Sequence, residues 1–174
     1  MDHSAEIVKG VVSKTGTSLT TRTMLEKDIQ AYCALFQRIF AQPPWNEAWT
    51  TGKIRVAVKK IMSKKGFIGI TAEYESQPVG YVTGYRLRIS PIIPSLCYLD
   101  QLFVDDRYRG IGIGTSLLSQ MVCRVNTRRD FGIVLLTKAN STAEQFYLQN
   151  GFKRCASILR FKGNVLLYKL LQYR

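Results

Sequence analysis

The stretch Tyr98–Val125 constrains the fold more than any other part of the chain, because a strand, a glycine-rich turn and a helix follow one another there. Residues 98–104 carry apolar side chains for both faces of a strand. The turn Arg109–Gly114 contains three alternating glycines. An apolar stripe with the i, i+3/i+4 period of a half-buried helix follows the turn. Its members are Leu117, Leu118, Met121, Val122 and Val125.

The glycine turn predicts a phosphate-binding site. Glycines leave little room for side chains, so the backbone N–H groups of the turn can point at an anion. The first N–H groups of a helix have no partner within the helix, and the helix dipole favours negative charge at that end. The alternative is that the glycines only form a tight turn with a close contact between helix and strand.

The spacing of the glycines excludes two common nucleotide-binding motifs. A dinucleotide-binding fold needs G-x-G-x-x-G and an acidic residue at the end of the next strand. Here the glycines alternate, and the nearest acidic candidate, Asp130, precedes the next strand. The G-x-x-x-x-G-K-[ST] loop of nucleotide triphosphatases is also absent from the sequence.

Two motifs carry a resemblance to a known family. The pattern Arg109-x-x-Gly112-x-Gly114 resembles the [QR]-x-x-G-x-[GA] signature of the GNAT superfamily, acyl-CoA-dependent N-acyltransferases. The segment Asn140–Phe152 is similar to the family pattern N-x-x-A-x-x-x-Y-x-x-x-G-F, and it follows the apolar strand Phe131–Thr137, where the family places it. The two motifs together are far more specific than either alone. The resemblance covers Thr17–Leu171.

The resemblance implies an α/β GNAT fold, with a mixed, mostly antiparallel sheet flanked by helices. The sheet is expected to splay between Tyr98–Val104 and Phe131–Thr137. We expect a single domain over residues 1–174, with residues 1–16 loosely ordered. The implied reaction moves an acetyl group from acetyl-CoA to a primary amine by direct attack. No cysteine lies in a motif that would support a covalent enzyme intermediate.

The resemblance also assigns the coenzyme A site. The glycine turn would hold the pyrophosphate, and Asn140 matches the residue that contacts the cofactor's arm. A backbone N–H near Leu102 or Phe103 would stabilise the oxyanion, a contribution of about 3 kcal/mol in a dry site. The predicted cofactor-binding residues are Leu102, Phe103, Val104, Arg109, Gly110, Ile111, Gly112, Ile113, Gly114, Thr115 and Asn140. No metal ligand is predicted.

Catalysis needs an acid for the leaving thiolate and a base for the amine. Tyr147 matches the family's general-acid tyrosine, although it could be a core aromatic beside Phe146. An alkyl amine is only about one part in a thousand neutral at pH 7, so a proton acceptor is required. Asp100 is the first candidate, with a role in strand-end hydrogen bonding as the alternative, and Glu73 is the second. His3, the single histidine, lies in the weakly patterned start and is a poor candidate.

Three large aromatic side chains, Phe40, Trp45 and Trp49, surround a double proline between two predicted helices. They could simply hold the helices together, or they could wall an acceptor pocket. We predict the pocket, and with it a small amine that is neutral or acidic overall. A protein N-terminus or lysine is the first alternative, although it needs an open groove. A non-catalytic acyl-CoA-binding or nucleic-acid-associated module is the second.

The net charge of +13 favours acidic partners. Coenzyme A accounts for part of this excess. The chain has no basic tail and no aromatic RNA-binding signature, so we favour solvated basic faces plus a phosphate-binding cleft over a nucleic-acid surface. Nucleic acid and a homodimer stay open as partners. The basic field also disfavours polycationic acceptors such as aminoglycosides and polyamines.

The sequence predicts a cytoplasmic protein without a membrane partner. The first ten residues contain no apolar run, and the longest candidate span, Phe131–Leu136, is far too short to cross a bilayer. Four scattered cysteines are expected to be small buried side chains in a reducing compartment. They are Cys33, Cys97, Cys123 and Cys155.

The remaining pattern predicts the other elements. Thr23-x-x-Glu26 suggests a capping box before the first helix. Helices are expected at Thr50–Ser63 and Ala143–Asn150. Strands are expected at Thr17–Met24, Phe67–Tyr74, Pro78–Arg88, Phe152–Phe161 and Asn164–Leu171. Glu75-Ser76-Gln77 would join Phe67–Tyr74 to Pro78–Arg88 as a hairpin. Gly151 would end the helix Ala143–Asn150.

Overall fold

The structure is a computed structural model that describes residues 8–12, 18–88, 90–92, 94–155 and 163–171. His3 lies outside these residues. Along the chain the elements are β1 (Val8–Val12), β2 (Ser18–Thr23), a short 3-10 helix (Glu26–Asp28), α1 (Ile29–Phe40), α2 (Thr51–Met62), β3 (Ile68–Tyr74), β4 (Gln77–Leu87), β5 (Leu96–Val104), a second 3-10 helix (Asp106–Tyr108), α3 (Ile113–Thr127), β6 (Gly132–Lys138), α4 (Thr142–Gln149), β7 (Lys153–Arg154) and β8 (Asn164–Leu170).

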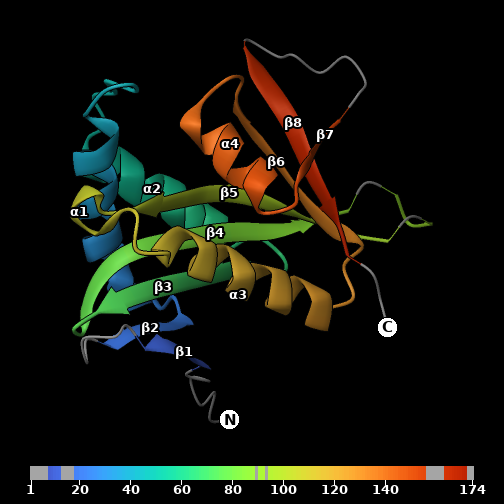
Figure 1. Ribbon diagram of the computed structural model, residues 1–174, viewed down its shortest axis with the longest axis horizontal. Helices are drawn as coiled ribbons and strands as arrows, with labels where there is room; N and C mark the ends of the chain where they lie inside the picture. Colours follow the sequence, from blue (N-terminus) through green and yellow to red (C-terminus); the bar gives the residue numbers. More distant parts are fainter. Residues whose placement is uncertain (1–7, 13–17, 89, 93, 156–162, 172–174) are drawn as a thin grey trace.

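Within the described residues the strands form one sheet in the order β1-β2-β3-β4-β5-β6-β8-β7 (Figure 1). Every neighbouring pair is antiparallel except β5 and β6, which are parallel. The predicted mixed, mostly antiparallel sheet flanked by helices is therefore confirmed.

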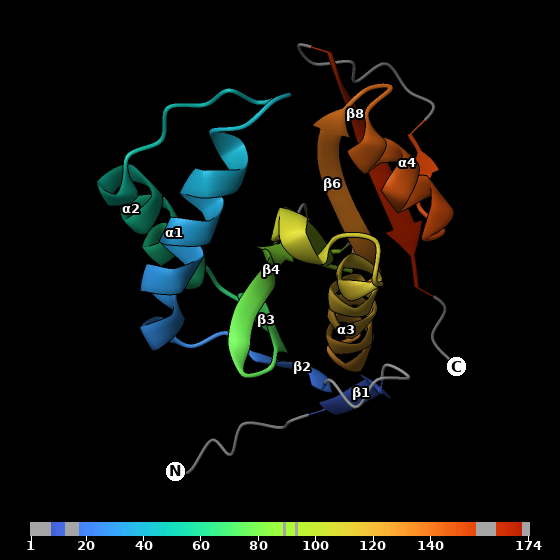
Figure 2. The same ribbon diagram turned by 60° about the vertical axis from the view of Figure 1, so that its left-hand side comes forward.

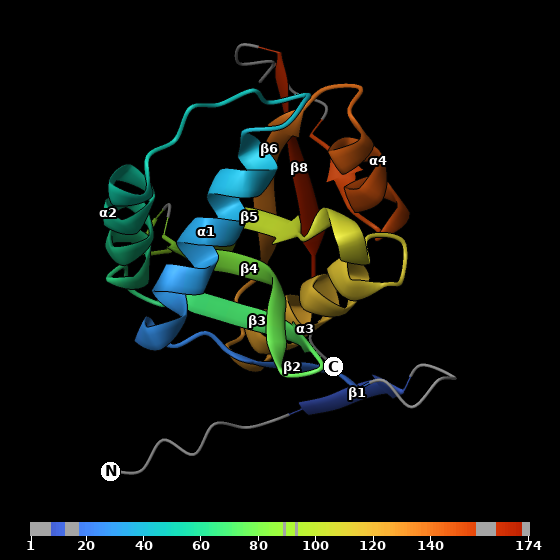
Figure 3. The same cartoon turned by 90° about the vertical axis from the view of Figure 1, so that its left-hand side faces the viewer.

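Helices cover both faces of the sheet (Figure 2). On one face α1 and α2 enclose a core that includes Tyr32, Tyr81 and Phe103, whose rings contact one another. Figure 3 looks onto this face, where α1 crosses in front of β4. On the other face α3 buries Leu117 and Met121 against the strands. Since burial of one such side chain contributes about 1.5–3 kcal/mol, these two cores fix the layers.

Strands β5 and β6 separate soon after they meet. Among the described residues their pairing runs from Leu96 with Gly132 to Tyr98 with Val134. Strand β5 continues to Val104, paired on its other side with β4. Strand β6 continues to Lys138, paired with β8. The sheet is therefore splayed along the far parts of both strands, as the sequence predicted.

A β-bulge lies at Asp100, in the part of β5 that has left β6. Thr83 of β4 is opposite Gln101, whereas the next residue, Gly84, is opposite Leu99, so Asp100 has no partner on β4. The extra residue shifts the alternation of side chains along the strand, which is why Leu99 and Leu102 both reach the α3 side. Bulges of this kind re-aim side chains, and here the change falls on a carboxylate.

One local prediction was wrong, the capping box at Thr23, and another, the β3–β4 hairpin, was right except that Gln77 already belongs to β4. Thr23 is the last residue of β2 and does not cap a helix. The backbone N–H of Leu25, just before the 3-10 helix, donates to Asp28 Oδ2 at 2.7 Å. The β3–β4 hairpin turns on two residues, Glu75 and Ser76, both with positive φ, because Tyr74 already pairs with Gln77.

Other predictions were only partly met. Cys33 and Cys97 are buried as expected, but Cys123 is exposed on α3 and Cys155 is half-buried. In the segment expected to be loosely ordered, residues 8–12 form β1. Of the strand predicted over Phe152–Phe161, β7 covers Lys153–Arg154, and residues 156–162 lie outside the described residues.

A partly buried ion-pair cluster ties the start of α1 to the sheet. Arg22 donates to both carboxylate oxygens of Asp28, at 2.7 and 2.8 Å, and to Glu73 at 2.9 Å. Burial alone would raise the pKa of Asp28, but the bonds from Arg22 and from the Leu25 amide outweigh burial and hold this pKa below its usual range. Glu73, the second candidate base, is thus engaged in this cluster.

We expect Asp28→Ala to lower the free energy of unfolding by about 3–5 kcal/mol, since it leaves the Arg22 charge with one partner fewer in a buried place. Because the native pKa is lowered, this stabilisation is present above the ordinary pKa of 3.8 and is lost as the pH falls below it. Urea unfolding at pH 7 and pH 3 measures both effects.

Glu26→Ala is the matched control for Asp28→Ala. The Glu26 side chain is 80% exposed and lies 3.5 Å from the Lys59 ammonium, so its loss should cost under about 1 kcal/mol. Equal losses in the two variants would contradict this account of the cluster.

Candidate active site

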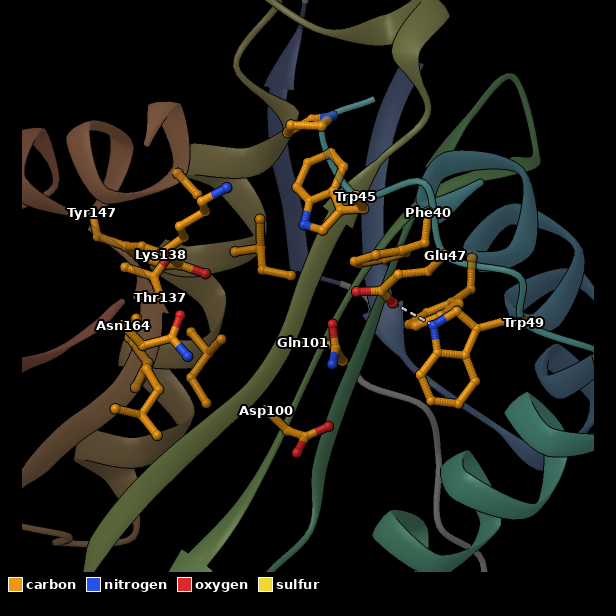
Figure 4. Close-up of a pocket in the computed structure, with 17 residues that line it drawn as sticks. Phe40, Trp45, Glu47, Trp49, Asp100, Gln101, Thr137, Lys138, Tyr147 and Asn164 are labelled. Atoms are coloured by element: carbon orange, nitrogen blue, oxygen red, sulfur yellow. Dashed lines mark hydrogen bonds between the residues drawn. The ribbon is translucent and has the colours of Figure 1, made fainter. Parts of the chain in front are cut away.

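A cleft of about 610 Å³ opens where β5 and β6 diverge (Figure 4). Its walls come from the segment between α1 and α2 on one side, from β6 and α4 on the other, and from β5 between them. The lining residues are Phe36, Phe40, Pro44, Trp45, Glu47, Trp49, Leu99, Asp100, Gln101, Leu102, Leu135, Leu136, Thr137, Lys138, Ala143, Tyr147 and Asn164.

One wall of the cleft is aromatic. The Phe40 ring stacks on Phe36 with centroids 4.1 Å apart, and the Trp45 ring lies 5.3 Å from Phe40. Trp49 meets the edge of Phe36 at 5.9 Å, and its indole N–H donates to the Glu47 carboxylate. Trp45 lines the cleft and is 40% exposed, so at least this indole is not a core side chain.

The middle of the cleft carries two polar side chains from the bulge, Asp100 and Gln101 (Figure 4). Burial raises the pKa of Asp100 above its usual range, and the Lys64 charge offsets this only in part. Four carboxylates of the described residues are nearly fully buried, and each forms an ion pair with an arginine, namely Asp28, Asp105, Asp130 and Glu144. Asp100 has no ion pair among the residues that the structure describes.

Tyr147 lines the cleft from α4, opposite the aromatic wall (Figure 4). Its ring meets those of Phe146 and Phe152 edge-on, with centroids at 5.2 and 5.5 Å. Burial raises the pKa of Tyr147 well above its usual value. Tyr147 is therefore both a packed aromatic, as the alternative had it, and a hydroxyl in the cleft that stays protonated at neutral pH.

The glycine turn before α3 has an open concave backbone. Gly110 and Gly112 have φ of +81° and +88°, and a Cβ at either position would meet nothing within 4 Å. The left-handed backbone requires glycine at positions 110 and 112, whereas Gly114 has no such backbone, and a Cβ there would lie 3.4 Å from the Phe146 ring. No backbone acceptor among the described residues pairs with the amides of residues 110–115. A phosphate group fits this open set of donors.

Arginines surround the entry to this turn. Arg109 pairs with Asp106 at 2.5 Å and keeps its side chain half exposed. Asp105, at the end of β5, binds Arg107 at 2.7 Å and Arg38 of α1 at 2.5 Å. The hydrogen bond from Arg107 is the main cause that holds the pKa of Asp105 below its usual range. The turn is thus anchored to α1 through one carboxylate.

The predicted site residues fall into four groups. Six of them line the cleft, namely Phe40, Trp45, Trp49, Asp100, Leu102 and Tyr147. Phe103 and Val104 are buried in the two cores, so only their backbone can contribute to a site. Residues 109–115 form the turn, apart from the cleft lining. Asn140 is exposed, with φ of +58°, and its backbone N–H donates to the buried carboxylate of Glu144 at 2.7 Å.

The sequence analysis missed several polar residues of the cleft, namely Glu47, Gln101, Thr137, Lys138 and Asn164. Glu47 had a signal, because it lies between the two tryptophans. Gln101 had no such signal, because neighbouring side chains of a regular strand point to opposite faces. Only the bulge brings both Asp100 and Gln101 to the cleft. Thr137 and Lys138 end the apolar run of β6, a position that polar residues often take for solvation alone.

The family model of the acetyltransferase (GNAT) domain matches residues 48–154, which is more than half of the chain. The chain belongs to the GNAT acetyltransferase family. The predictions of the family, of an acetyl-CoA-dependent N-acetyltransferase and of coenzyme A as its cofactor are thereby confirmed. A comparison with curated protein sequences found no match.

Solved structures show the same fold. A GNAT acetyltransferase from Staphylococcus aureus is 19% identical with a TM-score of 0.74, and the match covers 89% of this chain and 100% of that one. The ribosomal-protein-alanine N-acetyltransferase from Brucella melitensis is 20% identical with a TM-score of 0.69, over 87% and 99% of the chains. The PaiA N-acetyltransferase from Thermoplasma acidophilum, solved with coenzyme A, is 16% identical with a TM-score of 0.69, over 88% and 99%.

No helix among the described residues of this GNAT protein is long and apolar enough to cross a membrane.

We expect Gly112→Leu to weaken coenzyme A binding by at least about tenfold, because the new side chain fills the open turn and disfavours its left-handed backbone. Isothermal titration calorimetry measures the affinity. Gly151→Leu is the matched control, with φ of +82° at the end of α4 and only the flexible Lys169 side chain within 4 Å of a new Cβ. Equal effects of the two changes on affinity would contradict a binding role for the turn.

Proposed function

We propose that this GNAT protein acetylates a small primary amine in the cleft between the aromatic wall and α4. The observation that carries this proposal is that two titratable side chains line one cleft, Asp100 from β5 in its middle and Tyr147 from the α4 wall. Asp100 is a partly buried carboxylate with a raised pKa, and Tyr147 is a buried hydroxyl with a raised pKa. Perturbed groups that face one cleft are typical of an acid and a base.

The open turn of residues 110–115 would hold the pyrophosphate of coenzyme A through its unpaired amides. Asn140, exposed where β6 leads into α4, would contact the cofactor's arm. The free edge of β5 beyond Tyr98 would face that arm, because this edge has no pairing with β6. When bound, acetyl-CoA supplies a thioester whose carbonyl accepts an amine and whose sulfur leaves as a thiolate.

Tyr147 would act as the general acid. A tyrosine with the ordinary pKa of 10.0 is already protonated at neutral pH, and burial raises the pKa of Tyr147 further, so the hydroxyl carries a proton for the leaving sulfur. The edge-on rings of Phe146 and Phe152 hold the Tyr147 ring in place and exclude water from one side of it.

Asp100 would act as the general base. A raised pKa makes its carboxylate a better proton acceptor at neutral pH than an ordinary aspartate, and the acceptor ammonium must lose a proton before it attacks. A backbone N–H of β5 near Leu102 or Phe103 would stabilise the negative charge on the carbonyl oxygen.

The shape of the cleft favours a small acceptor. The aromatic side chains Phe40, Trp45 and Trp49 wall one side, and Glu47 and Lys138 add one charge of each sign. Such a partly apolar, bounded cleft fits a small amine that is neutral or acidic overall better than a long peptide. A protein N-terminus or lysine is the alternative acceptor. The cytoplasmic location stays a prediction.

We expect Tyr147→Phe to lower kcat by about 10²-fold or more while the affinity for acetyl-CoA stays the same, since a general acid contributes 10²–10⁴-fold. Tyr85→Phe, which removes a hydroxyl from a tyrosine outside the cleft, is the control and should change neither quantity. Steady-state kinetics measures kcat, and calorimetry measures the affinity for acetyl-CoA. An unchanged kcat in Tyr147→Phe would mean that another group protonates the leaving thiolate.

We expect Asp100→Asn to lower kcat/KM by about 10²-fold and to raise stability at pH 7 by on the order of 1 kcal/mol. Because the native pKa is raised, the folded state binds the proton more tightly than the unfolded state. The stability of the natural protein therefore falls as pH rises from the ordinary pKa of 3.8 through the native value.

The stability gain of Asp100→Asn should accordingly vanish below that range, which urea unfolding at several pH values measures. Glu75→Gln in the exposed β3–β4 turn should change neither activity nor stability. Full activity in Asp100→Asn would exclude it as the base.

A further inference from the structure

A second, smaller hollow lies between α1, α2 and β5. Its volume is about 90 Å³, and its lining is almost entirely apolar, with Phe36 from α1 and Ile54, Ala57, Val58 and Ile61 from α2. Ile54 and Val58 are buried core residues, whereas Ala57 lies at the exposed rim. The hollow is therefore bounded by fixed side chains on its inner side.

This hollow adjoins the main cleft. Phe36, Trp49, Asp100 and Gln101 line both spaces, so they form the boundary between them. The Asp100 carboxylate thus stands at the junction, with apolar space on the α2 side and the open cleft on the other. Besides Asp100 and Gln101, the lining residues that carry a polar atom are Tyr32 and Trp49.

We propose that this hollow binds a compact aliphatic group that the acceptor carries next to its reactive amine. This inference rests on the proposed function, because it takes Asp100 as the group that meets the amine. Asp100 and Glu47 place two carboxylates on this part of the cleft, which favours an ammonium there. An apolar substituent on the neighbouring carbon then reaches the hollow and leaves water.

The volume sets the size of the group. An apolar cavity of about 150 Å³ accepts a benzene molecule, so a space of about 90 Å³ is too small for an aromatic ring and suits a branched chain of about three or four carbons. Each CH₂ group that is buried contributes roughly a fourfold gain in affinity. The hollow therefore selects an amine with an aliphatic side chain over one with no side chain.

Amino-acid amides test this, because glycinamide, valinamide, leucinamide and tryptophanamide share one α-amine and one charge. With acetyl-CoA, kcat/KM for valinamide or leucinamide should exceed that for glycinamide by at least about tenfold, and tryptophanamide should gain nothing from the hollow. Ala57→Phe, which fills the hollow from α2, should remove this advantage while leaving glycinamide turnover unchanged. Val56→Phe is the matched control, since Val56 is 69% exposed on the same helix and lines neither space.

Equal kcat/KM values for leucinamide and glycinamide, or an Ala57→Phe effect that is the same for both, would overturn the inference. Calorimetry in the presence of coenzyme A supplies a readout that does not depend on turnover, with leucinamide expected to bind at least about tenfold more tightly than glycinamide. Equal affinities for leucinamide and glycinamide would overturn the proposed role of the hollow even if no amide is acetylated. Selective binding without acetylation would leave the hollow in place and contradict the proposed acetyl transfer instead.

Discussion

The separation of β5 from β6 is the constraint on which the rest of the site depends. These strands are the single parallel pair among the described residues, and their pairing ends at Tyr98 and Val134. Beyond that point each strand is held from its outer side, β5 by β4 and β6 by β8. Each strand therefore keeps its backbone hydrogen bonds on its outer side where the two strands separate. The space between β5 and β6 can then accept a ligand.

The buried carboxylates differ in their pairing from the carboxylate that lies in that space. Asp28, Asp105 and Asp130 are nearly fully buried and are each paired with an arginine, and these pairs hold the elements together. Asp100 differs, because the bulge in β5 places it at the junction of the cleft and the hollow without an ion pair among the described residues. A carboxylate in such a place costs stability, and proteins retain such costs where function needs them.

The sequence predicted what local patterns encode. The order of the elements, the stripe of α3 and the end of α4 at Gly151 follow from periodicity and from the conformational freedom of glycine. What it could not predict depends on tertiary pairing. The bulge at Asp100 exists only against β4, and the use of Asp28 in place of Thr23 at the start of α1 depends on Arg22 in the neighbouring strand. Likewise, the hollow between α1 and α2 requires two helices whose contact no single segment reveals.

Hydrogen–deuterium exchange of the backbone amides, followed with and without saturating coenzyme A, tests the central claim most directly. The claim is that the free edge of β5 and the open turn before α3 together hold the cofactor. The account predicts slower exchange in residues 99–104 and 110–115 when coenzyme A is bound. Unchanged exchange in both segments, while calorimetry shows that coenzyme A is bound, would contradict it.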